Sequence, residues 1–362
     1  MQQPDVCIAG AGIIGLSLAL ELNHRGAHVT VLERSTPLAE ASTAAAGMLA
    51  GNDPHNPAPL QPLANLSLAL YPAYLDRLHN LSGIRVPFQT HKTLQSLAPH
   101  TTARHSKLST EVLAKLLPAL IPGRHCFALL DENSIDPRQL APALLAAVQA
   151  TPINLQHNTP VLGTCSTHNG TRSTHNAIEI QTPAGQLAAN YFVDCTGAWS
   201  ATTSSLSNIK VTPRKGQMLS VALPGPLDLV VRTPDIYIVP RTTGPNAGQA
   251  VIGATIEDAG FDKIVHTSDI ARLHAAAAEL LPLLATAPRI EAWAGLRPAT
   301  SDNLPILGAL PNQPHHLLAT GHFRDGILLA PATAHLIAQL LTNESPAINL
   351  TPFSPARQSL PT

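Results

Sequence analysis

The stretch DVCIAGAGIIGLSLALELNHRGAHVTVLE, residues 5–33, decides the fold. Residues 5–9 form a short apolar run, residues 15–25 have the apolar spacing of a helix, and residues 28–33 form a second apolar run. A strand, a helix and a second strand within about 30 residues are typical of a parallel crossover unit. We therefore predict an α/β protein that begins with a βαβ unit.

The turn between the first strand and the helix reads GAGIIG, with glycines at Gly10, Gly12 and Gly15. In this spacing the first glycine permits a tight turn, the second lets the backbone approach a pyrophosphate, and the third lets the helix pack on the strand. The second strand ends at Glu33, where a carboxylate can hydrogen-bond ribose hydroxyls. The unit predicts a dinucleotide site, with a purely structural turn as the alternative. Because Arg34 stands beside Glu33, a dinucleotide with a 2′-phosphate, such as NADP, stays open as a ligand.

The composition points to small-molecule partners. The 362 residues are 44% hydrophobic and 12% charged, and the formal net charge is −1. A chain of this length usually forms about two domains, and a balanced charge gives no basic footprint for nucleic acid. No apolar stretch reaches the roughly 18 residues of a membrane span, and the N-terminus lacks a signal-peptide pattern. We expect a cytoplasmic protein that binds neither nucleic acid nor membrane.

The four cysteines show no CxxC pair and no metal-ligand spacing. Cys7 and Cys195 lie in apolar, strand-like stretches, where a buried free thiol is the simplest interpretation. Free thiols suit a reducing compartment. We therefore expect no metal site.

The rest of the chain alternates helical and strand-like segments. Asp136 is the predicted N-cap of one helix. The predicted helices cover about 64–80, 137–149, 268–285 and 327–341. The predicted strands are hairpin strands at 153–165 and 176–195 and a β meander at 211–256, whereas 84–135 mixes short strands and helices.

These segments predict two interwoven domains. A nucleotide-binding α/β domain would comprise residues 1–85, 136–205 and 300–362. A β-rich domain, inserted into it twice, would comprise residues 86–135 and 206–299. We expect the β-rich domain to bind the substrate.

Four further motifs bear on which dinucleotide is bound, because the glycine turn alone fits both NAD and FAD. Small residues at 41–50 allow a backbone to approach a flat ligand, although a plain helix start is the alternative. A helix that begins near Gly326 could stabilise negative charge on a reduced flavin ring. The motifs are ASTAAAGMLA at 41–50, VDCTGAWS at 193–200, AGLRPAT at 294–300 and GHFRDGILLAPATAHLIA at 321–338.

Together with the N-terminal unit, these motifs resemble the FAD-dependent D-amino acid oxidase family, and within it the bacterial glycine oxidase subgroup. The resemblance spans residues 5–341, although 86–135 carries none of its motifs. It implies a Rossmann-like FAD domain of glutathione reductase type with an inserted antiparallel-sheet substrate domain. It also implies non-covalent FAD, because the cysteine that attaches flavin in some sarcosine oxidases has no counterpart after Cys195.

The resemblance implies a set of residues that hold FAD. Val161, on the first strand of the predicted hairpin, would present its backbone to the adenine. Arg324 would meet the pyrimidine end of the isoalloxazine, with a solvated surface arginine as the alternative. Two positions depart from the family pattern without removing a backbone contact: Asp325 replaces a usual Asn, and Cys195 and Thr196 replace a usual Ala. The implied set is Gly10, Gly12, Ile13, Ile14, Gly15, Glu33, Arg34, Thr43, Ala46, Gly47, Met48, Val161, Thr196, Gly197, Trp199, Arg324, Gly326, Ile327 and Leu328.

The resemblance also implies a substrate site. Arg297 would pair with the carboxylate of an amino acid, because a planar guanidinium binds a carboxylate with two hydrogen bonds. An internal ion pair with Glu291 or Asp302 is the alternative. Tyr237 would lie at the same carboxylate, with cross-strand packing as its alternative. Ile256 would line the pocket and keep it narrow.

The implied activity is that of a glycine oxidase, which oxidises glycine, sarcosine or small D-amino acids to imines and reduces O2 to hydrogen peroxide. The imine of glycine would supply the thiazole of thiamine. A D-amino acid dehydrogenase that passes electrons to a quinone is one alternative, and a flavin-binding protein without turnover is another. The family implies a homo-oligomer, either a tetramer or a dimer.

Overall fold

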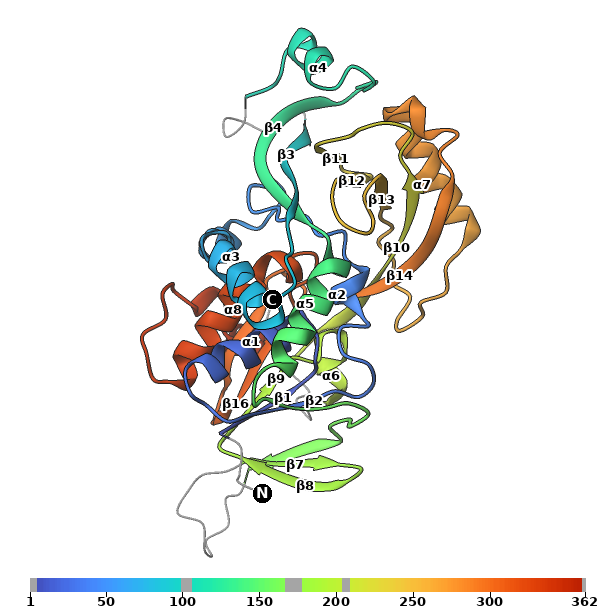
Figure 1. Cartoon of the computed structure of the whole chain (residues 1–362). Helices are drawn as coiled ribbons and strands as arrows, with labels where there is room; N and C mark the ends of the chain where they lie inside the picture. Colours follow the sequence, from blue (N-terminus) through green and yellow to red (C-terminus); the bar gives the residue numbers. More distant parts are fainter. Residues whose placement is uncertain (1–4, 99–105, 167–177, 204–208, 360–362) are drawn as a thin grey trace, which may run out of the picture.

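The structure is a computed structural model, and it describes residues 5–98, 106–166, 178–203 and 209–359. Figure 1 shows a lower and an upper lobe, with the N-terminal βαβ unit in the lower one. The main sheet of the lower lobe has the strand order β15-β16-β9-β1-β2-β5. Neighbours pair in parallel except β15 and β16, which are antiparallel. The strands are Val6–Ala9 (β1), Val29–Leu32 (β2), Asn154–Gln156 (β5), Tyr191–Asp194 (β9), Ile306–Leu310 (β15) and Gln313–Thr320 (β16).

Long helices cover this sheet and form the larger hydrophobic core with it. Pro331 inside the last of them has no N–H to offer the carbonyl of Ile327 one turn earlier. The buried hydroxyl of Tyr71 donates to that carbonyl instead, at 2.6 Å, and Ser67 donates to the carbonyl of Leu328 at 2.6 Å. These bonds fix the start of the last helix. The helices are Ile13–His24 (α1), Gln61–Ser82 (α3), Pro137–Gln149 (α5) and Gly326–Leu341 (α8).

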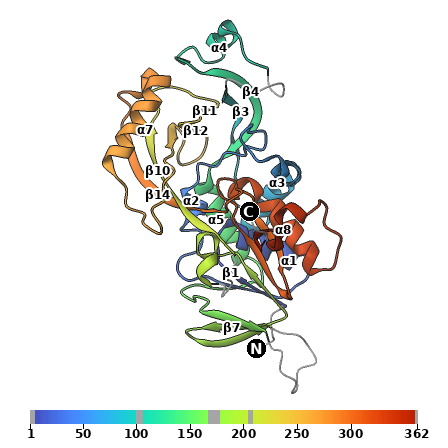
Figure 2. The same ribbon diagram turned by 180° about the vertical axis from the view of Figure 1, so that it is seen from behind.

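The upper lobe is built on a seven-stranded sheet with the order β14-β10-β13-β12-β11-β3-β4. Its pairs are antiparallel except β11 with β3. Figure 2 shows β10 and β14 reaching from this lobe towards the lower one. The strands are Phe88–Leu97 (β3), Cys126–Ile135 (β4), Thr212–Ala222 (β10), Val230–Arg232 (β11), Tyr237–Arg241 (β12), Gln249–Gly253 (β13) and Arg289–Ala299 (β14).

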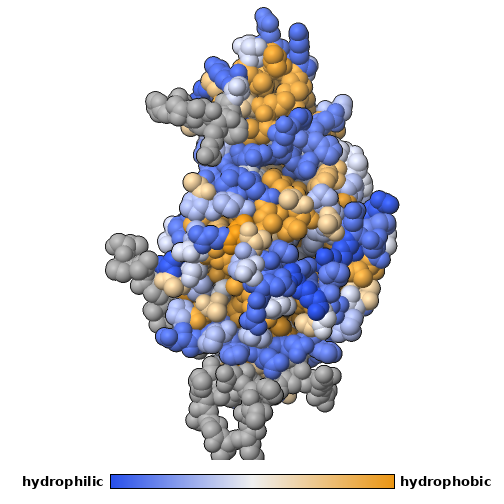
Figure 3. Space-filling view, turned by 90° about the vertical axis from the view of Figure 1, so that its left-hand side faces the viewer, coloured by the Kyte–Doolittle hydropathy of each residue, from blue (hydrophilic) through white to orange (hydrophobic). Residues whose placement is uncertain are grey.

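Smaller elements complete the chain. Helix α7 (Thr267–Leu280) packs on the seven-stranded sheet and shares its core. Helix α4 (Thr110–Leu116) lies at the tip of the upper lobe, where Figure 3 shows apolar side chains gathered at the surface. A third sheet joins Gly163–Ser166 (β6), Ile178–Thr182 (β7) and Gly185–Ala189 (β8). Within the described ranges, no helix is long and apolar enough to cross a membrane.

The helix predictions agree with the structure to within a few residues, and Asp136 caps α5 by accepting a hydrogen bond from the Arg138 N–H at 2.9 Å. Two strand predictions were wrong. Residues 84–135 contain the expected short helix, α4, but their strands are two long paired ones, β3 and β4, rather than several short ones. The expected hairpin at 153–165 and 176–195 is divided, because β5 and β9 join the parallel sheet while β6, β7 and β8 form their own. Every strand of the seven-stranded sheet lies within 86–135 or 206–299, although the exact domain boundaries stay a prediction.

Candidate active site

A cavity of about 380 Å³ is lined by residues of both large sheets. Its wall includes the glycine turn after β1, the residues after β9, the segment around α2 (Ala41–Ala44), and the start of α8. The seven-stranded sheet contributes Tyr237 and Arg297. The cavity therefore joins the predicted nucleotide site to the predicted substrate site.

The glycine turn is packed so closely that side chains cannot be added at two of its positions. A Cβ on Gly10 would lie 2.6 Å from the carbonyl oxygen of Cys195, and one on Gly15 would collide with the carbonyl oxygen of Gly10. Gly12 differs, because its nearest neighbour would be the Ser42 hydroxyl at 3.4 Å. Gly12 is also the N-cap of α1 and has no side chain with which to cap it. Apart from the Ile13 N–H, whose hydrogen bond the Ser42 hydroxyl accepts, the N-terminus of the helix meets the cavity as an anion site would.

Glu33 and Arg34 lie on the cavity wall beside this turn. The two carboxylate oxygens of Glu33 accept hydrogen bonds from the N–H groups of Ala11 and Ser35, at 2.8 and 2.9 Å. Arg34 pairs with Glu40 at 2.8 Å, and its guanidinium carbon lies 3.6 Å from the centre of the Trp199 ring. These contacts fix both side chains next to the place predicted for the adenosine.

Four residues of the implied FAD set are placed differently from the prediction. Gly15 packs against the carbonyl of Gly10 and does not line the cavity. Val161 lines the cavity, but it precedes β6 instead of lying on a strand. Thr43 does not line the cavity, because its hydroxyl turns back to donate to the carbonyl of Leu38 at 2.9 Å. Leu328 is buried in the helical core and does not reach the cavity. Ser42, which the sequence reasoning missed, does line it and accepts a hydrogen bond from the Ile13 N–H at 2.9 Å.

The segment between α2 and β3 passes close to the other lobe. Gly47 has φ +86°, and a Cβ there would collide with the carbonyl oxygen of Ile135. Only glycine is tolerated where two backbones meet in this way. Ala46 and Met48 on either side of it line the cavity. The small residues that predicted close approach to a ligand therefore also allow close approach between two segments of the protein.

The start of α8 meets the opposite part of the cavity. Asp325 is its N-cap, makes no side-chain capping bond, and is buried. Burial raises the pKa of Asp325 to about 6. His322 is buried behind it, with its Nε2 3.0 Å from the Thr333 hydroxyl, and burial lowers its pKa to about 3. A second uncapped helix N-terminus thus meets the cavity, together with Gly326 and Ile327.

Arg297 forms no ion pair with any carboxylate in the part of the chain that the structure describes. Its Nη1 donates to the carbonyl of Thr255 at 3.1 Å, and its guanidinium lies against Gly216. The internal ion pair considered as an alternative is wrong, because Glu291 pairs with Arg138 and Asp302 pairs with Arg357. Burial lowers the pKa of Arg297 from its ordinary value, yet an arginine stays charged in proteins. The cavity therefore contains a partly buried cation that can accept an anionic ligand.

Tyr237 lies next to Arg297, and the positive charge of that guanidinium acts on its hydroxyl. Its ring lies over Gly253, where a Cβ would collide with the phenol. Burial raises the pKa of Tyr237, so the hydroxyl stays protonated at neutral pH. Ile256 also lines the cavity, but it is 62% exposed and stands at the rim.

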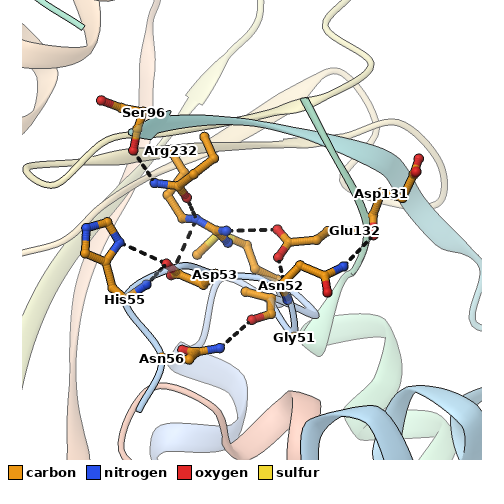
Figure 4. Close-up of polar contacts among 12 residues, drawn as sticks. Gly51, Asn52, Asp53, His55, Asn56, Ser96, Asp131, Glu132 and Arg232 are labelled. Carbon is orange, nitrogen blue, oxygen red and sulfur yellow. Dashed lines mark hydrogen bonds and ion pairs between the residues drawn. The ribbon is translucent and has the colours of Figure 1, made fainter. Parts of the chain in front are cut away.

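Two buried charged groups were not predicted from the sequence. Figure 4 shows Arg232 between Asp53 and Glu132, with Nε 3.6 Å from Asp53 and Nη2 2.9 Å from Glu132. Arg241 lies 3.6 Å from the buried Asp136 and donates to the carbonyl of Ala46 at 2.9 Å, which joins the two lobes. Each arginine ends an apolar strand, and this position is the signal by which the sequence could have indicated both.

The site fits FAD in three respects. The glycine turn forms a cradle that added side chains would fill. The N-termini of α1 and α8 meet the same cavity, and neither is capped by the side chain of its own N-cap residue, so they can stabilise a pyrophosphate and a reduced flavin ring. No described cysteine lines the cavity except Cys195, which is buried at the end of β9. FAD would lie along the wall between the two helix ends.

Comparisons with known proteins agree with this arrangement. A family model described as FAD dependent oxidoreductase matches residues 5–340. Glycine oxidase of Geobacillus kaustophilus is 31% identical over 98% of this chain and 97% of that protein. The bifunctional protein ThiO/ThiG of Trichormus variabilis is 35% identical over 94% of this chain, which spans only 53% of that longer relative.

Solved structures give the same result. A crystal structure of glycine oxidase from Geobacillus kaustophilus matches with a TM-score of 0.88 and 30% identity, and 98% of each chain is covered. Iminodiacetate oxidase from Chelativorans sp. BNC1 matches with a TM-score of 0.80 and 25% identity, over 97% of this chain and 98% of that one. The chain belongs to the D-amino acid oxidase family of FAD-dependent oxidoreductases, and its cofactor is FAD.

Proposed function

We propose that this chain is a glycine oxidase that converts glycine, and sarcosine or small D-amino acids, to the corresponding imines. The observation that carries the proposal is Arg297, a partly buried guanidinium without a carboxylate partner in the described structure, in the same cavity as the FAD cradle. The similarity to two glycine oxidases over nearly the whole chain supports it. Similarity to ThiO/ThiG further supports supply of the glycine imine to the thiazole of thiamine.

The residues of the cavity can orient an amino acid without acid–base chemistry of their own. Arg297 would bind the substrate carboxylate, and the Tyr237 hydroxyl beside it would donate to a carboxylate oxygen. Two fixed contacts at one end of so small a molecule determine where its Cα lies. Bound FAD supplies the chemistry by accepting the hydride from Cα.

The start of α8 would stabilise any negative charge that the reaction places on the cofactor, because an uncapped helix N-terminus stabilises anions. Arg324 lines the cavity near it and pairs with Asp53 at 3.2 Å. The imine product would hydrolyse to a 2-oxo acid and ammonia, and O2 would regenerate FAD with release of hydrogen peroxide. We infer a cytoplasmic, homo-oligomeric enzyme. Its four free cysteines support a reducing compartment, and exposed apolar residues such as Val112 and Ile121 support contacts between copies.

The test is a steady-state assay of the purified, FAD-loaded protein with glycine, sarcosine, D-alanine and D-proline. Oxygen consumption and peroxide are measured together, and a parallel anaerobic assay supplies a soluble quinone as acceptor. The proposal predicts turnover of glycine with one peroxide formed for each O2 consumed. Turnover only with the quinone, and only of larger D-amino acids, would instead establish the dehydrogenase.

A further inference from the structure

Asp53 is held rigidly in the loop that follows the run of small residues at 41–50. Its carboxylate accepts hydrogen bonds from the N–H of His55, at 2.9 Å, and lies 3.0 Å from the imidazole of the same residue. Its backbone N–H donates to the carbonyl of Ala50 at 3.3 Å, and the side chain of Asn56 donates to that carbonyl at 2.8 Å. The side chain of Asp53 is only 4% exposed, so it has little freedom to move away.

This fixed carboxylate lies between two arginines of the cavity wall. Asp53 Oδ2 is 3.2 Å from Nη2 of Arg324 and 3.6 Å from Nε of Arg232. Arg232 has a second anionic partner in Glu132 and also donates to Gln95. Arg324 has no other carboxylate partner in the part of the chain that the structure describes. Asp53 is therefore the residue that neutralises Arg324.

The ionised form of Asp53 is maintained by its surroundings. Burial raises the pKa of Asp53, but the positive charge of Arg232 and the N–H of His55 outweigh burial, and the pKa lies below its ordinary value. Asp53 therefore carries a full negative charge at neutral pH. Asp235 adds another carboxylate to the cavity wall, where it is largely exposed and 3.5 Å from Arg124.

We propose that Asp53 selects monocarboxylate substrates: by pairing with Arg324 it leaves Arg297 as the one guanidinium of the described cavity wall that is free to bind a carboxylate. The inference deepens the proposed function and rests on it, because it assumes that Arg297 binds the substrate carboxylate. A second carboxylate on a ligand would meet the negative charges of Asp53 and Asp235, and the nearest positive charge, on Arg324, would already be paired. Repulsion between a second carboxylate of the ligand and these carboxylates is stronger in a cavity from which the bound ligand excludes water than it would be in bulk water.

The experiment measures binding of acetate and malonate to the FAD-loaded protein from the perturbation of the flavin absorbance. Neither anion can be oxidised as an amine, so binding is read without turnover. Wild type is expected to bind acetate at least about tenfold more tightly than malonate. In Asp53→Asn, which releases Arg324, the Kd for malonate is expected to fall by about tenfold, while that for acetate changes by less than about threefold.

The double variant Asp53→Asn with Arg324→Met separates the charge of Arg324 from other effects of residue 53. It is expected to lose the gain in malonate affinity. Asp302→Asn is the matched control, because it also removes a carboxylate from an ion pair, with Arg357, but lies outside the cavity. It is expected to leave both affinities unchanged.

An Asp53→Asn protein that retains FAD and the wild-type ratio of malonate to acetate affinity would overturn the proposal. If Asn at position 53 prevents folding, Arg324→Met in the wild-type background replaces that test, because it removes the positive charge that Asp53 neutralises at the cavity and leaves Asp53 paired with Arg232. Malonate should then bind still more weakly relative to acetate, and an unchanged ratio would overturn the proposal. If glycine fails to reduce the flavin while the preference for acetate still depends on Asp53, the proposed glycine oxidase activity is wrong and the proposed role of Asp53 stands.

Discussion

The two ends of the cavity are built differently. At the nucleotide end, Gly10, Gly12 and the start of α1 present backbone, and packing at Gly10 excludes side chains. At the other end, Arg297 and Tyr237 present partly buried side chains that are held by partners far away in the sequence. Backbone binding depends on the local path of the chain, whereas side-chain binding depends on long-range contacts. Substitutions at the first end should remove the fold or the cofactor, and those at the second should change substrate recognition with the cofactor retained.

Gly15→Ala should have the largest effect. The added Cβ would collide with the carbonyl oxygen of Gly10, and a backbone atom within a packed turn has little room to move. We expect a loss of about 3 kcal/mol or more in the free energy of unfolding, measured by urea denaturation of the apoprotein.

Gly12→Ala sharpens this prediction within the same motif. Its Cβ would have an ordinary distance of 3.4 Å to the Ser42 hydroxyl, so the free energy of unfolding should change by less than about 1 kcal/mol. FAD should nevertheless bind at least about tenfold more weakly, because the Cβ separates the pyrophosphate from the backbone. Equal losses of stability in Gly15→Ala and Gly12→Ala would contradict this prediction, because they would show that both glycines serve packing and that neither is specific to the ligand.

Arg297→Met should keep FAD bound and raise the KM for glycine. Loss of the partner of the substrate carboxylate is expected to lower kcat/KM by an amount equivalent to about 2–5 kcal/mol of transition-state stabilisation. The measurement is steady-state peroxide formation. Arg357→Met removes an arginine that pairs with Asp302 outside the cavity and should leave kcat/KM unchanged. Wild-type kinetics in Arg297→Met would exclude this residue from the site.

Asp325 should make the stability of the apoprotein depend on pH. The folded-state pKa of this acid is raised to about 6, so the folded protein binds a proton more tightly than the unfolded chain. The contribution of Asp325 to the free energy of unfolding therefore declines as the pH rises from about 4 to about 6 and is constant above about pH 7. The total decline is at most about 3 kcal/mol.

The measurement is urea denaturation of wild type and Asp325→Asn at several pH values. The stability of wild type relative to the variant should fall across that range. A relative stability that rises with pH, or does not change, would show that the carboxylate is not buried in the folded protein as described.

Tyr237→Phe should have the smallest effect. It removes one hydrogen bond to the carboxylate but keeps the ring that lies over Gly253. An increase in KM equivalent to about 0.5–1.5 kcal/mol is expected, with an unchanged free energy of unfolding. An effect as large as that of Arg297→Met would assign Tyr237 a role in the reaction itself.

The same contrast explains how far sequence analysis reached. The glycine turn, Glu33 and the helices α1, α5 and α8 were predictable, because their signals lie within one or two turns of chain. The resemblance to a known family then indicated FAD and the roles of Arg297 and Tyr237, which periodicity and spacing alone could not supply.

The remaining features depend on contacts across the fold. Nothing local at Asp53 indicates that it will meet Arg232 and Arg324, which are far from it in sequence. Thr43 fits the pattern of a flavin contact, yet its hydroxyl bonds to Leu38 while its neighbour Ser42 faces the cavity. Strands β3 and β4 were missed because they pair mainly with each other and carry many polar residues, which obscures the alternation of a half-buried strand.

The most direct test of a cavity that brings FAD and a small amino acid together is a single anaerobic turnover. FAD-loaded wild-type protein is mixed with glycine in the absence of O2, the flavin absorbance band is followed, and glyoxylate and ammonia are measured after hydrolysis of the imine. We predict complete bleaching, a rate that saturates with glycine concentration, and one glyoxylate for each FAD. A flavin that stays oxidised with glycine, sarcosine and small D-amino acids alike would contradict this account.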